Sequence, residues 1–172
     1  GLCFPRFMSL DLNSATGMFL GLAIGDAMGS PIEFEKPRPR DNYIRRYQSG
    51  GFHSVSKGEF TDDTSMALAI ADALIESQKT NGYPFDGHMI MNNFLDWRYN
   101  GKFSPREKCF DVGLTVNGAL WKYKEDKTTP FTGCTHYKSA GNGGLMRLAP
   151  VLIVAKNKSE AIYLARESTR LT

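Results

Sequence analysis

The sequence of 172 residues contains few of the side chains that usually hold zinc or form disulfide bonds. It has three cysteines (Cys3, Cys109 and Cys134) without C-x-x-C spacing, and three histidines that lie far apart along the chain. An odd number of scattered cysteines argues against both a zinc site and a disulfide framework. We therefore expect free, buried thiols in a protein of a reducing compartment.

Long apolar runs and a strong excess of one charge are also lacking. No segment approaches the ~20 apolar residues of a membrane-spanning helix, and the N-terminal run is interrupted by Pro5 and Arg6, which argues against a signal peptide. The net charge is only +3, from 21 basic and 18 acidic residues, which gives no electrostatic case for nucleic-acid binding. We expect a cytoplasmic protein that binds neither membranes nor nucleic acid.

Helical periodicity is the main structural signal in the sequence. Apolar residues recur at helical spacing over six segments: 14–28, the segment that follows the acidic pair at 62–63, 87–99, 112–124, 144–155 and 159–170. No stretch alternates cleanly enough to predict a strand. The pattern predicts an all-α protein with a single domain over residues 1–172 and a core from about residue 13. The long loop at 30–60 is unusual for a compact domain, and such loops are often functional.

Four glycines recur every four residues in the first predicted helix: Gly17, Gly21, Gly25 and Gly29. A glycine inside a helix costs roughly 1 kcal/mol relative to alanine. The simplest compensation is close approach by a neighbouring backbone. We therefore expect leucine at Gly21 or Gly25 to destabilise the fold by overpacking.

Asp26 lies on the apolar side of the same helix, following Phe19 and Leu22. A carboxylate in such a place must be hydrogen-bonded or paired with a cation. It is either a structural aspartate that binds loop amides or a catalytic group, and the first interpretation is favoured.

An acidic pair stands in the segment GEFTDDTSMALAIADAL, immediately before a helical pattern. Thr61 is a good N-cap residue, and Asp62 and Asp63 would stabilise the first turn through the helix dipole. The same three residues offer hard oxygen ligands of the kind that Mg²⁺ and Mn²⁺ prefer. The two interpretations are compatible, because a helix N-terminus would hold the ligands rigidly.

Two other segments could complete such a site. In GDAMGSPIEF, Glu33 follows directly on the end of a predicted helix. In SAGNGGLMRLAP, a glycine-rich turn precedes another predicted helix, and its backbone N–H groups could face an anion. The same Asn-Gly-Gly sequence is also an ordinary turn. Together, a hard-metal triplet and a phosphate-compatible turn suggest a phosphorylated, sugar-like ligand.

Four segments resemble the successive signature blocks of the ADP-ribosylglycohydrolase family: GLAIGDAMGSPIEF, GEFTDDTSMAL, CFDVGLTVNGAL and SAGNGGLMRLAPV. The family includes the hydrolase that reactivates dinitrogenase reductase and the ADP-ribosylarginine hydrolases. The resemblance implies an all-α, orthogonal multi-helix fold with a binuclear Mg²⁺ or Mn²⁺ centre. It also implies hydrolysis of the glycosidic bond between ADP-ribose and a protein side chain, most often arginine, or a small molecule.

The resemblance also assigns site residues by position. It implies three metal ligands, which are Thr61, Asp62 and Asp63. Glu33 matches the glutamate that closes over the site, and Asp111 matches an aspartate near the ribose and the leaving group, so these two carboxylates are the catalytic candidates. The substrate diphosphate and adjoining ribose would contact the turn formed by Asn142, Gly143 and Gly144. Met146 and Arg147 are expected to pack beneath that turn.

One family element has no counterpart in the sequence. The second metal-ligand group, an Asp-x-Asp-Thr/Ser motif late in the family pattern, is not found here. We therefore expect the N-terminal part of a longer enzyme, with an incomplete metal site and a tendency to self-associate or to bind its missing C-terminal half. The alternatives are a non-catalytic ADP-ribose-binding or regulatory module, and a purely structural helical domain.

Overall fold

The computed structural model describes residues 10–172, and the regular secondary structure in this range is helical, as the sequence predicts. The helices are α1 (Leu12–Gly29), α2 (Asp62–Asn81), α3 (Gly87–Asn100), α4 (Leu114–Glu125), α5 (Gly143–Met146), α6 (Ala149–Val154) and α7 (Lys158–Arg170), with short 3₁₀ turns at Ser30–Ile32 and Arg40–Asn42. The described residues include no strand, only an isolated antiparallel pairing of Gly50 with Val55. No helix in this part of the chain is long and apolar enough to cross a membrane.

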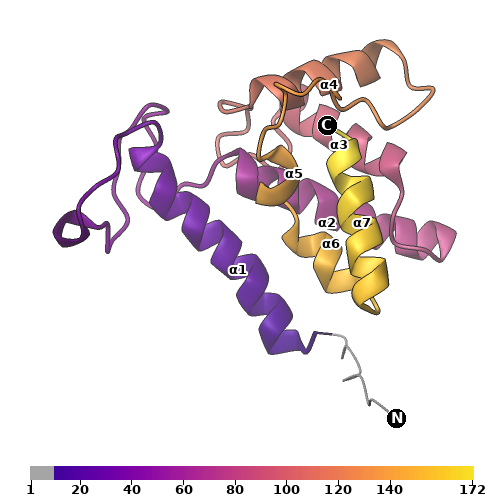
Figure 1. The fold of residues 1–172 in the computed structure, drawn as a ribbon, viewed down its shortest axis with the longest axis horizontal. Coiled ribbons are helices and arrows are strands. Elements are labelled where there is room, and N and C mark those ends of the chain that lie inside the picture. Colours follow the sequence, from indigo (N-terminus) through magenta and orange to yellow (C-terminus); the bar gives the residue numbers. More distant parts are fainter. Residues whose placement is uncertain (1–9) are drawn as a thin grey trace.

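The core lies around the antiparallel pair α2 and α3, which α4, α6 and α7 cover (Figure 1). On α2 the residues Met66, Ile70 and Leu74 are spaced by four and are fully or almost fully buried. Facing residues on α3, such as Phe94 and Trp97, are equally buried. Each side chain of this size stabilises the fold by about 1.5–3 kcal/mol on burial. The core therefore fixes the position of α2, whose N-terminus carries the acidic pair.

Glycines in the left-handed conformation end both central helices. Gly82 follows α2 with φ +69° and Gly101 follows α3 with φ +75°, the conformation in which glycine lacks the steric penalty of other residues. At Gly101 a Cβ atom would lie 2.1 Å from the carbonyl oxygen of Glu107. The loop therefore folds back on itself between residues 101 and 107, shortly before Asp111.

The helix expected over 144–155 is divided in two. The chain forms a single turn in α5, breaks at Arg147 and Leu148, and resumes as α6. Pro150 lies in the first turn of α6, where its missing N–H is tolerated, whereas inside a continuous helix it would remove a hydrogen bond. The prediction of one continuous helix was therefore wrong, although both parts are helical.

The expectation that all thiols are buried also needs correction. Cys109 is partly buried, but Cys134 is exposed, and Cys3 lies outside the described residues. Cys134 belongs to the 126–142 segment, which has little core to cover it.

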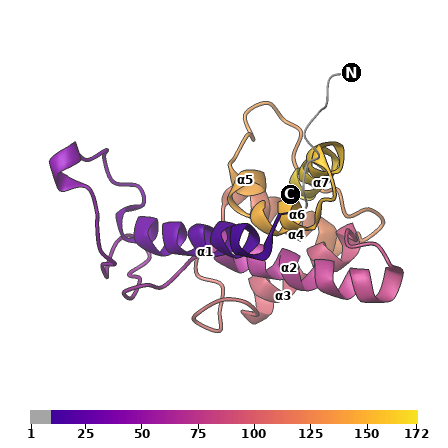
Figure 2. The same ribbon diagram turned by 90° about the horizontal axis from the view of Figure 1, so that it is seen from below.

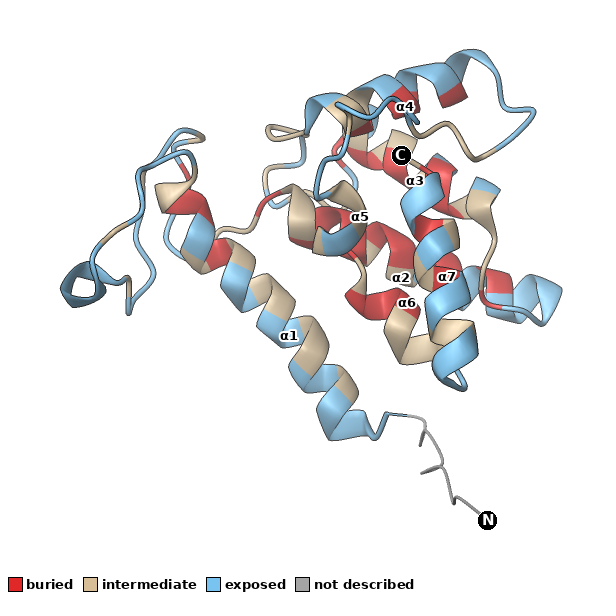
Figure 3. Ribbon diagram, in the orientation of Figure 1, coloured by how far each residue is buried: buried red, intermediate tan, exposed pale blue. Residues whose placement is uncertain are grey.

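Helix α1 differs from the others in how little of it is covered. It runs along one side of the remaining helices, and the segment that follows it projects beyond them (Figures 1 and 2). Buried positions occur only toward its C-terminal end, whereas α2 and α3 are buried along much of their length (Figure 3).

The glycine stripe of α1 faces open space. A Cβ atom added at Gly17, Gly21, Gly25 or Gly29 would meet nothing within 4 Å. The expected close backbone contact is therefore absent from the described structure, and that part of the sequence interpretation was wrong. Gly25 and Gly29 instead border the acidic pocket described below.

We expect Gly21→Ala to raise the free energy of unfolding of this chain by roughly 0.5–1 kcal/mol, because alanine lowers the entropy lost on helix formation. The control is Gly144→Ala, whose Cβ would lie 2.7 Å from Oγ1 of Thr169. We expect it to destabilise by about 1–3 kcal/mol through overpacking. Urea denaturation of both variants would measure this contrast, and a loss of stability at Gly21 would show that the stripe is packed in solution.

Candidate metal and substrate site

The carboxylate of Asp26 joins α1 to the N-terminus of α2. It accepts hydrogen bonds from the Oγ1 atoms of Thr61 (2.7 Å) and Thr64 (2.6 Å) and from the backbone N–H groups of the same two residues (2.9 and 3.0 Å). Thr61 is the N-cap residue by position, but its own side chain makes no capping bond. A carboxylate from another helix therefore caps α2, and the structural interpretation of Asp26 is confirmed.

Asp62 and Asp63 occupy the first turn of α2, as expected, and are largely removed from solvent. Burial raises the pKa of both carboxyl groups to about 7. Negative charge adds to the effect: Asp111, Asp26 and Glu33 raise the pKa of Asp62, and Asp62 in turn raises that of Asp63. Such a concentration of carboxylates is unfavourable unless protons or a cation compensate for it.

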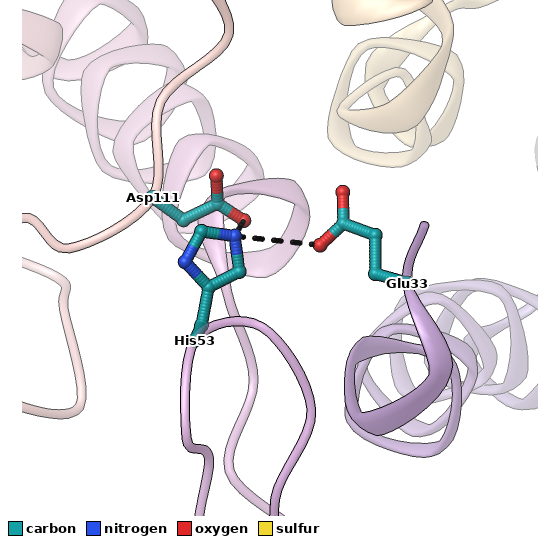
Figure 4. Close-up of side chains that lie close together, drawn as sticks. All are labelled: Glu33, His53 and Asp111. Carbon is teal, nitrogen blue, oxygen red and sulfur yellow. Dashed lines mark ion pairs between the residues drawn. The ribbon is translucent and has the colours of Figure 1, made fainter. Parts of the chain in front are cut away.

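Glu33, His53 and Asp111 meet beside this pair (Figure 4). The Nε2 atom of His53 lies 3.3 Å from Oδ2 of Asp111 and 3.6 Å from Oε2 of Glu33, and the three candidate ligand atoms lie within 4.8 Å of one another. Burial, followed by the charge of Glu33, raises the pKa of Asp111, although His53 opposes the shift. The structure therefore brings together the two predicted catalytic carboxylates, which are 78 positions apart in the chain (33 to 111).

His53 is a site residue that the sequence interpretation missed. Nothing in its spacing marked it, because it lies alone in the 30–60 loop and no other histidine is near it in sequence. Its Nε2 atom is buried and makes no hydrogen bond of good geometry to any described residue. The length of that loop was the one signal that pointed to this region.

A pocket of about 310 Å³ opens between the end of α1 and the start of α2. Its lining consists of small or acidic residues and hydroxyl groups: Gly25, Asp26, Gly29, Ser30, Glu33, Thr61 and Asp63. Asp62 does not line it, and the neighbouring charge that most affects Asp62 is that of Asp111. The carboxyl groups of Asp62 and Asp63 nevertheless lie close enough to affect each other's pKa.

The glycine-rich turn lies at a second pocket. Gly143 and Gly144 line a cavity of about 490 Å³, together with hydroxyl-bearing residues that include Thr115, Ser139 and Thr169. Asn142 is exposed, and its carbonyl oxygen accepts hydrogen bonds from the backbone of Leu145 and Met146. Because α5 has only four residues, it lacks the extended helix dipole that the sequence interpretation assumed behind this turn.

Arg147 is fully buried beneath the turn, as expected of a packing residue. Its guanidinium donates hydrogen bonds to the carbonyl of Ser168 (3.0 Å) and to Oγ1 of Thr172 (2.8 Å), and it lies 4.8 Å from the centre of the Phe94 ring. Burial lowers the pKa of Arg147 to about 9. This side chain joins the α5 turn to α7 and to the core.

These features define an all-α protein with an acidic site at the N-terminus of its central helix. A family model described as ADP-ribosylglycohydrolase matches residues 8–172, and the chain belongs to this family.

Related proteins support the same assignment. The chain is 37% identical over 152 residues to ADP-ribosylarginine hydrolase Tri1 of Pseudomonas putida (strain GB-1), covering 88% of this chain and 39% of the relative. It is 32% identical to ADP-ribosyl-[dinitrogen reductase] glycohydrolase of Rhodospirillum rubrum, covering 81% and 44%. A solved ADP-ribosylglycohydrolase-related protein complex matches with a TM-score of 0.71 at 35% identity, covering 92% of this chain and 48% of that one. The chain thus spans about two fifths of the length of these curated relatives.

Proposed function

We propose that this chain carries the metal-binding and ADP-ribose-binding part of a glycohydrolase that cleaves ADP-ribose from arginine side chains of proteins. The observation that carries the proposal is the convergence of Glu33, Asp62, Asp63 and Asp111 at the N-terminus of α2. The name of one relative supports the arginine linkage, because the Pseudomonas putida protein is an ADP-ribosylarginine hydrolase. A cytoplasmic location and association with a further polypeptide remain predictions.

The residues present fit a divalent cation. Burial and, after it, neighbouring negative charge raise the pKa of Asp62 and Asp63, and a bound cation would compensate for that charge. Carboxylate and hydroxyl oxygens are the ligands that Mg²⁺ and Mn²⁺ prefer. Thr61, Asp62 and Asp63 would hold the ion, and Glu33, His53 and Asp111 offer a second group of ligand atoms at the same site. A bound ion would supply Lewis-acid chemistry by polarising oxygens of the substrate ribose.

The two catalytic carboxylates differ in environment, which suggests different tasks. The side chain of Asp111 is 13% exposed and that of Glu33 is 39% exposed. Burial raises the pKa of Asp111, so of the two carboxyl groups this one is better suited to transfer a proton to the departing guanidine. Glu33, at the open edge, suits stabilisation of the positive charge that develops on the ribose. The Nε2 atom of His53 lies between the two carboxylates, 3.3 Å from Asp111 and 3.6 Å from Glu33.

The pocket beside the glycine-rich turn would hold the remote part of the substrate. Backbone at Gly143 and Gly144 can approach a diphosphate closely, and Thr115 and Thr169 supply hydroxyl groups nearby. Binding energy from this remote portion would orient the ribose carbon at the acidic site.

We expect Mn²⁺ to bind the purified chain. Asp63→Asn removes a proposed ligand, so it should weaken Mn²⁺ binding by more than about 10- to 100-fold, the loss typical when a residue that only supports the ligands is changed. Electron paramagnetic resonance of free Mn²⁺ measures this affinity, and calorimetry with ADP-ribose tests the second pocket. The matched control is Asp72→Asn, the same substitution on the exposed side of α2.

Turnover is a separate measurement, made as release of ADP-ribose from ADP-ribosylated arginine with Mn²⁺ present. We expect little turnover from the 172-residue chain alone and more when the remaining part of a family-length protein is added. Binding of ADP-ribose without turnover in either case would favour the regulatory module. Absence of any effect of Mn²⁺ would contradict the proposal.

A further inference from the structure

An ion pair between Glu59 and Arg106 joins two loops that carry the acidic site. Nε of Arg106 lies 2.7 Å from Oε1 of Glu59, and Nη2 lies 2.8 Å from Oε2, so both carboxylate oxygens are bound. The side chain of Glu59 is 11% exposed and that of Arg106 is 24% exposed. Hydrogen bonding to Arg106 holds the pKa of the Glu59 carboxyl below its ordinary value. A two-pronged contact of this kind fixes direction as well as distance.

Arg106 also contacts the chain on either side of the candidate ligands. Its Nη2 atom donates to the carbonyl oxygens of His53 and Ser54, both at 3.1 Å. Its guanidinium carbon lies 3.8 Å from the centre of the Phe110 ring, and Phe110 is the residue directly before Asp111. One side chain therefore holds the backbone of His53 and the ring next to Asp111.

Glu59 extends this connection to the other two parts of the site. Its carboxylate accepts a hydrogen bond from the backbone of Ser56 (2.7 Å), and its carbonyl oxygen accepts one from Oγ of Ser30 (3.4 Å), three positions before Glu33. Two positions after Glu59 comes Thr61, at the start of α2. The ion pair is thus connected to every segment that supplies a candidate ligand.

The same loops contain strained backbone. The non-glycine residues with positive φ in the described chain are Phe34, Ser54, Phe103 and Glu107, at +49° to +70°. All four lie in the segments that Glu59 and Arg106 connect. Such conformations persist only where surrounding contacts enforce them, and they concentrate at functional sites.

We propose that Arg106, held by Glu59, is a positioning residue that sets the relative placement of His53, Asp111 and Glu33. Its action toward a metal ion rests on the proposed function above, whereas its action on the loops does not. The competing explanation is that the pair only stabilises the fold.

The sign of the effect on Mn²⁺ separates the two explanations. Removing a positive charge near a cation site should by itself strengthen cation binding. If Arg106 positions the ligands, Arg106→Gln should instead weaken Mn²⁺ binding by about 10- to 100-fold, as loss of outer-shell support does. Arg106→Lys keeps the charge but cannot form the two-pronged contact, so it should recover only part of the affinity.

The experiment compares Arg106→Gln, Arg106→Lys and Glu59→Gln with the control Lys102→Gln. Lys102 lies in the same loop, pairs with Asp72 and contacts the Phe103 ring, but it does not touch Glu59 or His53. Mn²⁺ affinity is measured by paramagnetic resonance, and amide hydrogen exchange of the metal-free proteins is measured in parallel. We expect the rate of amide exchange over residues 50–60 to rise at least about tenfold in Arg106→Gln. Losing a hydrogen bond to a charged group shifts a local opening equilibrium by about that factor or more. Exchange in α2 and α3 should not change.

Unchanged exchange over 50–60 in Arg106→Gln would overturn the proposal, as would Mn²⁺ binding that stays equal or becomes tighter. A rise in exchange that spreads through α2 and α3 would also overturn it, because the pair would then be a general stabiliser. If the unmodified chain binds no Mn²⁺, the proposed function fails and the exchange measurement alone decides.

Discussion

Asp26→Ala is expected to lower the free energy of unfolding by about 3 kcal/mol or more, because a buried donor that loses its acceptor costs about 1–3 kcal/mol. Four donors depend on this carboxylate, two from Thr61 and two from Thr64, and both threonines are 3% exposed. They lie at the N-terminus of the central helix α2. The loss should also displace Asp62 and Asp63, which follow Thr61 directly.

Urea denaturation at pH 7 measures the effect, and Asp26→Asn and Asp11→Ala serve as comparisons. Asparagine keeps one acceptor oxygen and should recover part of the stability. Asp11 caps α1 through Ser14 at an exposed position, so its removal should matter much less. Equal denaturation midpoints for Asp26→Ala and the unmodified chain would show that water replaces the carboxylate.

Asp62→Asn is expected to stabilise the metal-free protein above pH 7 while abolishing tight Mn²⁺ binding. The pKa of Asp62 is raised from 3.8 to about 7 on folding, chiefly by burial. The folded state therefore binds more protons than the unfolded state between about pH 4 and pH 7, and stability falls as pH rises through this range. Asparagine removes the charge, so the gain at pH 8 should be on the order of 1–3 kcal/mol, at about 1.4 kcal/mol per pKa unit.

Melting temperatures from pH 4.5 to 8.5, first in metal-free buffer without chelator and then with Mn²⁺ added, test this expectation. The unmodified chain should lose stability with rising pH and recover it when Mn²⁺ is added, because the ion compensates for the same charges. The variant should show a flatter profile and no response to Mn²⁺. A metal-free profile that rises with pH in the unmodified chain would contradict the burial of Asp62.

Several features followed from local sequence alone. Apolar spacing predicted the positions of α1, α2, α3, α4 and α7 closely, since a helix that buries one face must repeat apolar residues with its own period. The acidic pair was placed correctly in the first turn of α2, because the helix dipole favours acidic residues within the first turn of the same segment. Family motifs then indicated Glu33 and Asp111, and the fold brings these two together.

Tertiary structure alone decided the features that depend on distant parts of the chain. Asp26 caps a helix that begins 36 positions later (26 to 62), and His53 enters the site from a loop with no periodic pattern. The glycine stripe of α1 has the spacing of a packed helix face, yet no described residue packs against it. Spacing along a chain states which residues share a face, but the neighbour of that face is set by how the whole core packs.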